Sequence, residues 1–246
     1  MNNENKGVLS IKKEHIEKFK EIINKFSKNT EIPKFGNWKK QSDKDIWERI
    51  FEQVIIVGDS DSYDRFHSKE NREIKEKVSY ARLKGMSDEN DIRKTIYEAL
   101  RDLGVRYAGK DIKKCKKTQA LTNIILWLKK NRKTPKSLLV DISKKKSDDE
   151  KIDYLRKTFK GMYLGGEKSS RDFLIGLGLI KNSIAFDVRI SNIFKKIGIK
   201  LPKNMEKYYK KVEEEVLEKI CKPLNITGTQ FDRILYNNYD DILEYL

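Results

Sequence analysis

Hydrophobic residues recur along most of the chain with the three- to four-residue spacing of an α-helix. Between Ile16 and Phe26 they fall on one face of a predicted helix. Residues 46–57 are apolar on almost every side and follow Ser42, a residue type that caps helix N-termini. We therefore predict an amphipathic helix near the start of the chain and a second, buried helix that stops at Gly58.

The same period predicts further helices in the rest of the chain. Asp88 and Asp148 stand where a capping side chain is needed, and Gly104 and Gly198 stand where a helix ends in a left-handed residue. Strand-like alternation is nearly absent, so the predicted fold class is all-α. These helices are expected at about 70–84, 88–103, 110–130, 148–160, 168–177, 188–197, 205–221 and 230–236.

Polar segments separate the predicted helices. Residues 59–68 are rich in Ser and Asp and are predicted to form a loop. Pro135 and residues 143–149 mark connections inside a domain rather than linkers between domains. Two stretches are compatible with short strands, residues 54–57 and 138–142.

The charge of the chain favours a polyanionic partner. Its 246 residues include 54 Lys and Arg against 38 Asp and Glu, a formal net charge of +16. Lys and Arg displace condensed counterions from phosphates, which suits a nucleic acid. A lysine-rich chain with solvated basic faces would have the same composition. The length allows one large domain or two modest ones.

Several other classes of protein are disfavoured. No run approaches 18 apolar residues, and the first residues lack the apolar stretch of a signal peptide. Cys115 and Cys221 are too few for a disulfide framework or a four-thiolate cluster, and the two histidines lack metal-ligand spacing. We expect no membrane association, no metal site and an intracellular location, such as the cytoplasm and nucleoid of a prokaryote.

Residues 157–196 contain the candidate chemistry. A predicted helix ends near Gly161, and a short turn leads through Gly165 and Gly166 to a second helix that begins near Lys168 and Ser169. Glycines before a helix let backbone N–H groups approach a phosphate, and the helix dipole favours negative charge there. Paired glycines before a helix are also common in ordinary tight turns.

An aspartate follows this second helix. Asp187 lies 19 residues beyond Lys168, between an apolar stretch and the predicted helix 188–197. In that position it is an ordinary helix N-cap, or a carboxylate held rigidly at a helix terminus for chemistry.

The order of helix, glycine-containing hairpin, lysine, helix and aspartate resembles the helix-hairpin-helix DNA glycosylase superfamily. It resembles in particular the bifunctional branch that contains endonuclease III and the 8-oxoguanine DNA glycosylases. Lys168 matches the nucleophilic lysine of the family and Asp187 its signature aspartate. Three further segments resemble other passages of the family: residues 47–58, 98–112 and 231–236. The resemblance therefore spans about residues 45–246.

The sequence also departs from the family pattern. The hairpin reads Leu164-Gly165-Gly166, without the usual first glycine, and Arg189 stands where the family often has His. The chain has no cluster of four cysteines, which argues against the iron–sulfur subgroup.

The resemblance implies a two-domain fold. A helical barrel is expected at residues 59–179, with the helix-hairpin-helix at about 149–178. The second helical domain is expected to be discontinuous and to combine residues 1–58 with residues 180–246.

The resemblance also implies two groups of binding residues. A damaged base must leave the stacked duplex and enter a pocket of aromatic and amide side chains. The base-pocket residues implied by the family are Gln53, Asp172, Phe173, Gln230, Phe231, Asp232 and Tyr236. The implied DNA-binding residues are Gly165, Gly166, Ser169, Arg189, Arg106 and Lys110.

The expected chemistry is cleavage of an N-glycosidic bond. Positive charge builds on the sugar, and the carboxylate of Asp187 would stabilise it. A neutral Lys168 amine would displace the base and form a Schiff base, after which β-elimination nicks the strand. We expect the helix N-terminus and partial desolvation to favour the neutral amine.

This resemblance predicts a monomeric DNA repair glycosylase and AP lyase that acts on double-stranded DNA with a damaged base, with 8-oxoguanine as the expected lesion. No cofactor is expected beyond a monovalent cation held by hairpin carbonyls. Three alternatives stay open: a glycosylase for an alkylated purine, uracil or mismatched thymine; a non-catalytic nucleic-acid-binding module; and a lysine-rich structural protein.

Overall fold

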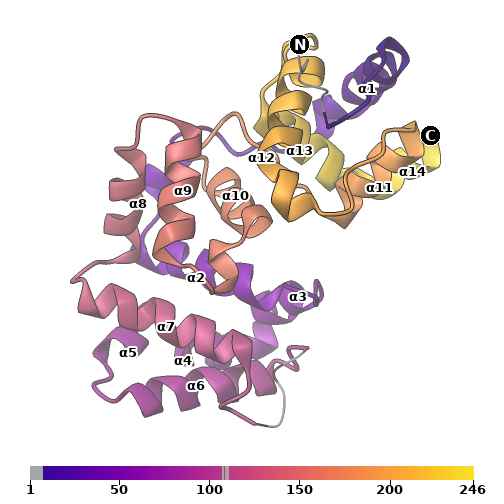
Figure 1. The fold of residues 1–246 in the computed structure, drawn as a ribbon. Helices are drawn as coiled ribbons and strands as arrows, with labels where there is room; N and C mark the ends of the chain where they lie inside the picture. Colours follow the sequence, from indigo (N-terminus) through magenta and orange to yellow (C-terminus); the bar gives the residue numbers. More distant parts are fainter. Residues whose placement is uncertain (1–7, 107, 109–110) are drawn as a thin grey trace. The chain divides into compact units, whose positions relative to one another are not determined.

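The computed structural model describes residues 8–106, 108 and 111–246 and contains only helices and connections within these ranges (Figure 1), which confirms the predicted all-α class. The chain divides into two compact units, residues 1–36 with 174–246, and residues 37–173. We call them the terminal unit and the middle unit.

The middle unit contains most of the helices. Its elements are the 3-10 turn η2 (Asn37–Lys40), α2 (Asp43–Ile55), α3 (Ser62–His67), η3 (Lys69–Asn71), α4 (Arg72–Lys77), α5 (Tyr80–Gly85), α6 (Glu89–Asp102), α7 (Lys116–Lys130), α8 (Pro135–Ser143), α9 (Asp148–Thr158), η4 (Tyr163–Gly165) and most of α10 (Glu167–Gly176).

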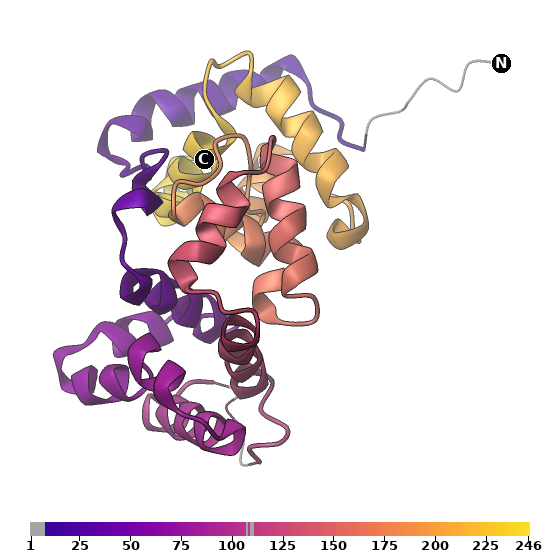
Figure 2. The same cartoon turned by 90° about the vertical axis from the view of Figure 1, so that its left-hand side faces the viewer.

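The terminal unit combines the two ends of the chain. It consists of α1 (Lys13–Phe26), the 3-10 turn η1 (Ser27–Asn29), α11 (Val188–Ile197), α12 (Met205–Val216), the π-helical turn η5 (Leu217–Cys221), α13 (Gly228–Asn237) and α14 (Tyr239–Tyr245). Figures 1 and 2 both show α1 beside the helices of the C-terminal segment, where it packs against η5 and α13.

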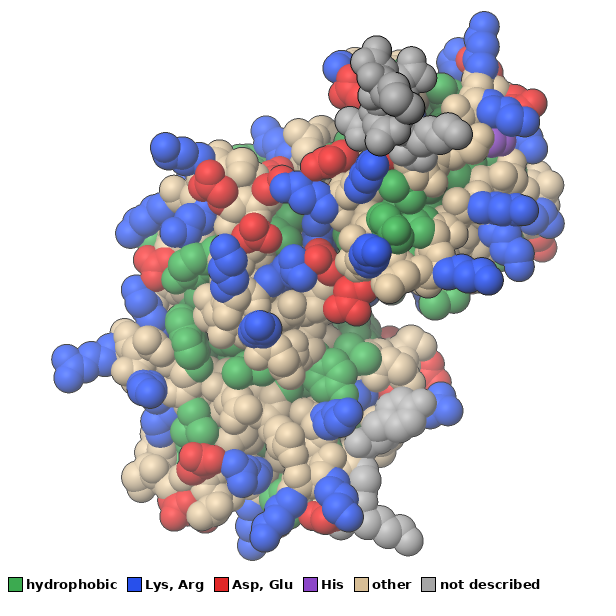
Figure 3. Space-filling model, viewed as in Figure 1, with side chains coloured by type: hydrophobic (Ala, Val, Ile, Leu, Met, Phe, Trp, Pro, Cys, Tyr) green, Lys and Arg blue, Asp and Glu red, His purple; other side chains and the backbone are tan. Residues whose placement is uncertain are grey.

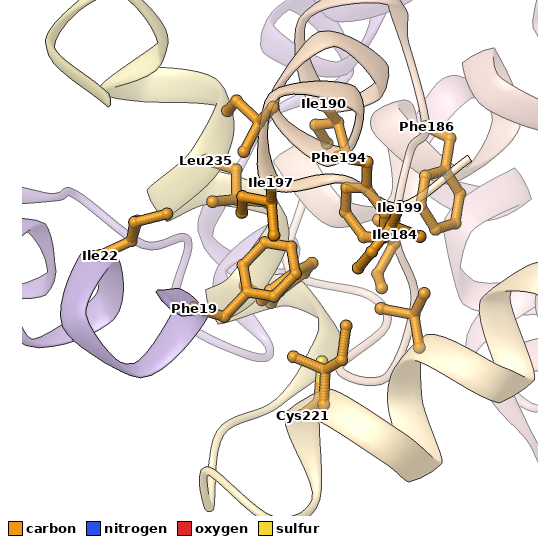
Figure 4. Close-up of a cluster of buried hydrophobic side chains, with 14 of the residues drawn as sticks. Phe19, Ile22, Ile184, Phe186, Ile190, Phe194, Ile197, Ile199, Cys221 and Leu235 are labelled. Atoms are coloured by element: carbon orange, nitrogen blue, oxygen red, sulfur yellow. The ribbon is translucent and has the colours of Figure 1, made fainter. Parts of the chain in front are cut away.

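Aromatic and branched side chains fill the core of the terminal unit (Figure 4). The Phe19 ring of α1 lies 5.1 Å from both the Phe194 ring of α11 and the Phe231 ring of α13, measured between centroids. Residues more than 170 positions apart in the sequence thus share one core. Cys221 is part of it, and burial raises the pKa of this thiol to about 12.

Helix α2 is the central element of the middle unit. The predicted Ser42 cap is present: its Oγ accepts the Asp45 N–H at 3.2 Å, while the Asp45 carboxylate accepts the Ser42 N–H at 2.8 Å. These hydrogen bonds from Ser42 hold the pKa of Asp45 below its usual range. Beyond the cap, Ile46, Ile50 and Phe51 are fully buried. The prediction of a buried helix after Ser42 is confirmed.

The boundary between the units differs from the expected one. We expected the first boundary after Gly58, which would place α2 with the chain termini. In the structure the middle unit begins at Asn37, because α2 packs against α5, α7 and α8. The second boundary lies after Phe173, whereas we expected it after residue 179.

Several predicted elements are wrong in detail. The helix expected at 70–84 is broken into α4 and α5, because Trp47 Nε1 donates to the Val78 carbonyl at 2.8 Å and Ser79 is extended. The loop expected at 59–68 contains α3, and Pro135 begins α8 as its first residue, capped by Thr134. The stretches compatible with strands, residues 54–57 and 138–142, lie in or at the end of helices, and α14 was not predicted.

Candidate active site

A tight connection, residues 159–166, joins α9 to α10. It contains η4 and a left-handed Gly161 with φ of 77°. At Gly165 the backbone runs directly against the end of α9, since a Cβ there would lie 2.2 Å from the Phe159 carbonyl oxygen. Gly165 is therefore required by the close approach of two backbone segments.

The amides of the glycine pair are used within the turn itself. The Gly165 N–H donates to the Met162 carbonyl at 2.9 Å, and the Gly166 N–H to the Tyr163 carbonyl at 3.5 Å. The first helical bond of α10 runs from the Ser170 N–H to the Gly166 carbonyl at 3.1 Å. The opening amides of a helix have no acceptor within the helix, and in α10 they belong to residues 167–169. In this structure the amides of Gly165 and Gly166 thus donate to carbonyls of the turn, and their expected contact with a phosphate stays a prediction.

Lys168 lies in the first turn of α10 and meets two predicted pocket residues there. Its Nζ is 2.9 Å from Asp172 Oδ2, one helical turn later. Gln53 Nε2, from the buried face of α2, donates to the same carboxylate oxygen at 3.3 Å. The lysine side chain is 32% exposed and that of Asp172 14%, so the pair is only partly buried. Thus α2 brings Gln53 to a pair of α10 residues that lies more than 100 positions later in the sequence.

A second ion-pair cluster fixes α10 to α9. Glu167 accepts Arg171 Nη1 at 2.5 Å and Arg156 Nη2 of α9 at 2.6 Å. Arg171 is buried, with 3% of the residue exposed. These residues were not among the predicted site residues, although the four-residue spacing of Glu167 and Arg171 is a recognisable helix pair. The role of Arg156 follows only from the packing of α9.

The other predicted residues of this segment differ in their surroundings. Phe173 is buried on α10, with 3% exposed. Ser169 donates its hydroxyl proton to the Tyr163 carbonyl and so closes the turn before α10. Burial raises the pKa of the nearby Tyr163 hydroxyl.

In the terminal unit, Asp187 is the N-cap of α11. Its Oδ1 accepts the Ile190 N–H at 3.0 Å, and its backbone carbonyl accepts the Ser191 hydroxyl at 2.6 Å. The side chain is half-buried, and Gly198 ends the helix with φ of 102°, as predicted. The capping hydrogen bond uses Oδ1, so the carboxylate is held at the start of α11 by the backbone of that helix.

Two buried carboxylates hold the segment that precedes Asp187. Glu213 Oε1 of α12 accepts the Ser183 hydroxyl at 2.5 Å and the Ile184 N–H at 2.8 Å. Asp232 Oδ1 of α13 accepts the Ala185 N–H at 2.7 Å. Asp232 is 1% exposed, so its predicted place in a base pocket is corrected to a support of this segment. Glu213 was not among the predicted site residues.

The remaining predicted pocket residues of α13 have separate surroundings. Phe231 is fully buried in the core, which is incompatible with direct base contact. Gln230 forms a capping box, with its Oε1 accepting the Thr227 N–H at 2.8 Å. The Tyr236 ring is half-buried and has guanidinium groups near its face: Arg189 at 4.8 Å and Arg233 at 5.7 Å from the ring centroid. Arg189, a predicted DNA-binding residue, is therefore next to a predicted pocket residue.

The predicted DNA-binding residues after α6 are only partly described. Lys110 lies outside the described residues. Arg106 is exposed, and its N–H donates to Asp59 Oδ2 at 2.6 Å, which also accepts Arg65 at 2.7 Å. The connection after α6 is thus attached to the segment that follows α2.

Lys117 is a buried lysine that the sequence analysis did not identify. It is 1% exposed at the start of α7, and its Nζ donates to the Ile55 carbonyl at the end of α2 at 2.6 Å. Burial lowers its pKa from the usual value, although Asp59 and Cys115 oppose the shift.

Charged side chains of both signs are spread over the visible face in Figure 3, and the basic ones form no single patch on it. Across the described residues, no group of three or more His, Cys, Asp or Glu side chains is arranged to hold a metal ion. None of the described helices is long and apolar enough to cross a membrane.

The chain is similar in structure to a known protein, although not detectably in sequence. No protein-family model matches the sequence, and no curated protein matches it. A solved structure, the 8-oxoguanine DNA glycosylase of Thermotoga maritima, is similar with a TM-score of 0.54 and 18% sequence identity, covering 90% of this chain and 92% of that chain. The expected fold is therefore confirmed.

Proposed function

We propose that this chain is a DNA repair glycosylase with AP lyase activity, and that its substrate is 8-oxoguanine in double-stranded DNA. The observation that carries the proposal is Lys168 in the first turn of α10, after a tight glycine turn, in a chain with the fold of an 8-oxoguanine DNA glycosylase. The half-buried Asp187 also supports the proposal. The Ile190 N–H holds its carboxylate at the start of α11, and a carboxylate held in place can stabilise positive charge as it develops.

The proposed reaction assigns one role to each residue. The Lys168 amine attacks the anomeric carbon of the damaged nucleotide, and the base leaves with the electrons of the glycosidic bond. Asp187 stabilises the positive charge that develops on the sugar. The covalent adduct opens to a Schiff base, and loss of a proton from the sugar allows β-elimination of the 3′ phosphate.

The surroundings of the predicted binding residues divide them into two groups. Phe231 and Asp232 serve the core and the segment before Asp187, and we assign neither to the base. Gln53 offers an amide beside Lys168, and Tyr236 offers an aromatic face beside Arg189, so these two stay as proposed base contacts. The opening amides of α10 are the proposed phosphate contact.

The test uses the full chain and a duplex with one 8-oxoguanine, scored separately for base release and for strand nicking. We expect wild type to do both, Lys168→Gln to lose both, and Asp187→Asn to lose at least about 100-fold in base release. Lys94→Gln, which removes an exposed charge on α6, is the matched control and should keep full activity.

Other outcomes would change the proposal in defined ways. If the enzyme released the base from a duplex with uracil or an alkylated purine but not from one with 8-oxoguanine, the proposed substrate would change and the proposed enzyme class would stand. If the chain bound duplex DNA in a salt-sensitive way but released no base from any lesion, the proposed function would change to that of a non-catalytic binding module.

A further inference from the structure

The amine of Lys168 is paired with a carboxylate. Asp172 Oδ2 lies 2.9 Å from Nζ, and the two residues are one helical turn apart on the same face of α10. A carboxylate at this distance stabilises the charged ammonium. We expected the helix N-terminus and partial desolvation to favour the neutral amine, whereas an ion pair favours the charged ammonium.

An ammonium has no lone pair, so the proposed nucleophile must lose a proton before it attacks. The acceptor must touch Nζ when the proton leaves, because proton transfer needs hydrogen-bond distance. Asp172 meets this condition. Glu167, the neighbouring acid on α10, instead accepts Arg156 and Arg171.

Gln53 fixes the carboxylate in place. Its Nε2 donates to the same Oδ2 at 3.3 Å from the buried face of α2, where the residue is 7% exposed. Asp172 is therefore held by a neutral donor from one helix and an ammonium from its own helix. When bound DNA removes water from such a pair, the neutral amine and carboxylic acid become more stable relative to the ammonium and carboxylate.

We propose that Asp172 is a catalytic residue, the proton acceptor that converts Lys168 into a nucleophile. A proton passes from Nζ to Oδ2, and the Nζ lone pair then bonds to the anomeric carbon. The glycosidic bond breaks with its electron pair on the departing base, and that base takes up the proton from Asp172. The inference rests on the proposed function, since it needs Lys168 as the attacking group.

The deciding experiment measures covalent trapping with borohydride on duplex DNA that contains a ready-made abasic site. This substrate isolates the lysine step from base recognition: the amine adds to the sugar aldehyde, water leaves, and borohydride reduces the Schiff base. Asp172→Asn keeps the size of the side chain and an oxygen that accepts from Nζ, but it cannot take the proton at neutral pH.

The two possible roles of Asp172 predict different changes in the rate of trapping. If it is the proton acceptor, trapping by Asp172→Asn should slow about 100-fold, and Asp172→Glu should recover part of the rate. If the carboxylate only stabilises the ammonium, its removal should leave trapping unchanged or make it faster, and this result would overturn the inference.

Two controls separate the remaining explanations. Asp153→Asn removes one acidic charge from the neighbouring helix α9, at a side chain that is 56% exposed, and should trap like wild type. Thermal unfolding tests whether each variant is folded. If Asp172→Asn does not fold, Asp172→Ser takes its place in the same comparison. Absence of trapping by wild type would reject the proposed lyase itself, whereas equal trapping by wild type and the Asn variant rejects only the role of Asp172.

Discussion

At position 165, a single hydrogen atom in place of a side chain decides whether the turn before α10 can form. A Cβ would stand 2.2 Å from one atom of the Phe159 carbonyl and 2.7 Å from the other, and both belong to the backbone. A flexible side chain could move aside, but this carbonyl is fixed at the end of α9. Gly165, three residues before Lys168, is thus constrained by packing, whatever binds there.

Gly165→Ala should therefore lower the free energy of unfolding by about 1–3 kcal/mol, the usual cost of forcing an added methyl into a filled space. The comparison is Gly85→Ala at the end of α5, where an added Cβ meets no atom within 4 Å and φ is not positive. That variant should be neutral or slightly more stable. Denaturant unfolding of the two variants measures the difference, and equal stability would contradict the predicted collision.

Lys117 predicts a pH dependence of stability. Burial lowers its pKa in the folded state, so between that pKa and the usual value of 10.5 the unfolded chain binds more protons than the folded one. Stability from this group therefore rises with pH through that window. Relative to Lys117→Met, wild type should gain unfolding free energy between neutral pH and about pH 10. Denaturant titrations at both pH values measure this gain, and parallel curves for the two proteins would refute it.

At the scale of elements, the segment before Asp187 is held from both sides by α12 and α13. Glu213 and Asp232 accept consecutive amides, and Tyr209 donates its hydroxyl to the Ile184 carbonyl at 3.0 Å. Gly228 contributes by its lack of a side chain, since a Cβ would lie 2.7 Å from the Ser183 nitrogen. The position of Asp187 at the start of α11 is therefore determined by the helices that follow it in the chain.

Removing one of these supports should loosen the segment locally. Glu213→Ala leaves the Ser183 hydroxyl and the Ile184 N–H without their acceptor, at a cost of about 1–3 kcal/mol for a buried group. Glu213→Gln keeps the accepting oxygen and is the matched control. Amide hydrogen exchange at residues 183–185 should accelerate in the Ala variant and change little in the Gln variant. Equal protection in both would show that other contacts hold the segment.

At the scale of the whole molecule, the terminal unit depends on residues from both ends of the chain. Phe19 is fully buried against rings of α11 and α13, so α1 shares one core with the C-terminal helices. Helix α1, which lies in the part of the chain that the family resemblance did not cover, therefore contributes structure to the unit that contains Asp187.

Phe19→Ala should destabilise the chain by about 3–5 kcal/mol, as expected for a large buried aromatic residue. Phe35→Ala is the control in the same unit, because that side chain is 56% exposed, and it should cost less than about 1 kcal/mol. Thermal or denaturant unfolding measures both. A small effect at Phe19 would mean that the C-terminal helices form their core without α1.

The sequence by itself determined the helical class and most helices, because the apolar period and the caps are local. Ser42, Asp187 and Gly198 act on backbone groups within four residues, so their roles could be predicted from spacing alone. Lys168 was identified by its position after the glycines, which is also a local pattern.

Only the tertiary structure decided what each side chain meets. Trp47 interrupts a helix 31 residues later through the Val78 carbonyl, and Gln53 reaches Asp172 over 119 residues. Phe231 and Asp232 looked like pocket residues because their types suit a base, yet one belongs to the core and the other supports the segment before Asp187. The period of a helix states which face is apolar, but the identity of the opposing group depends on how distant helices pack.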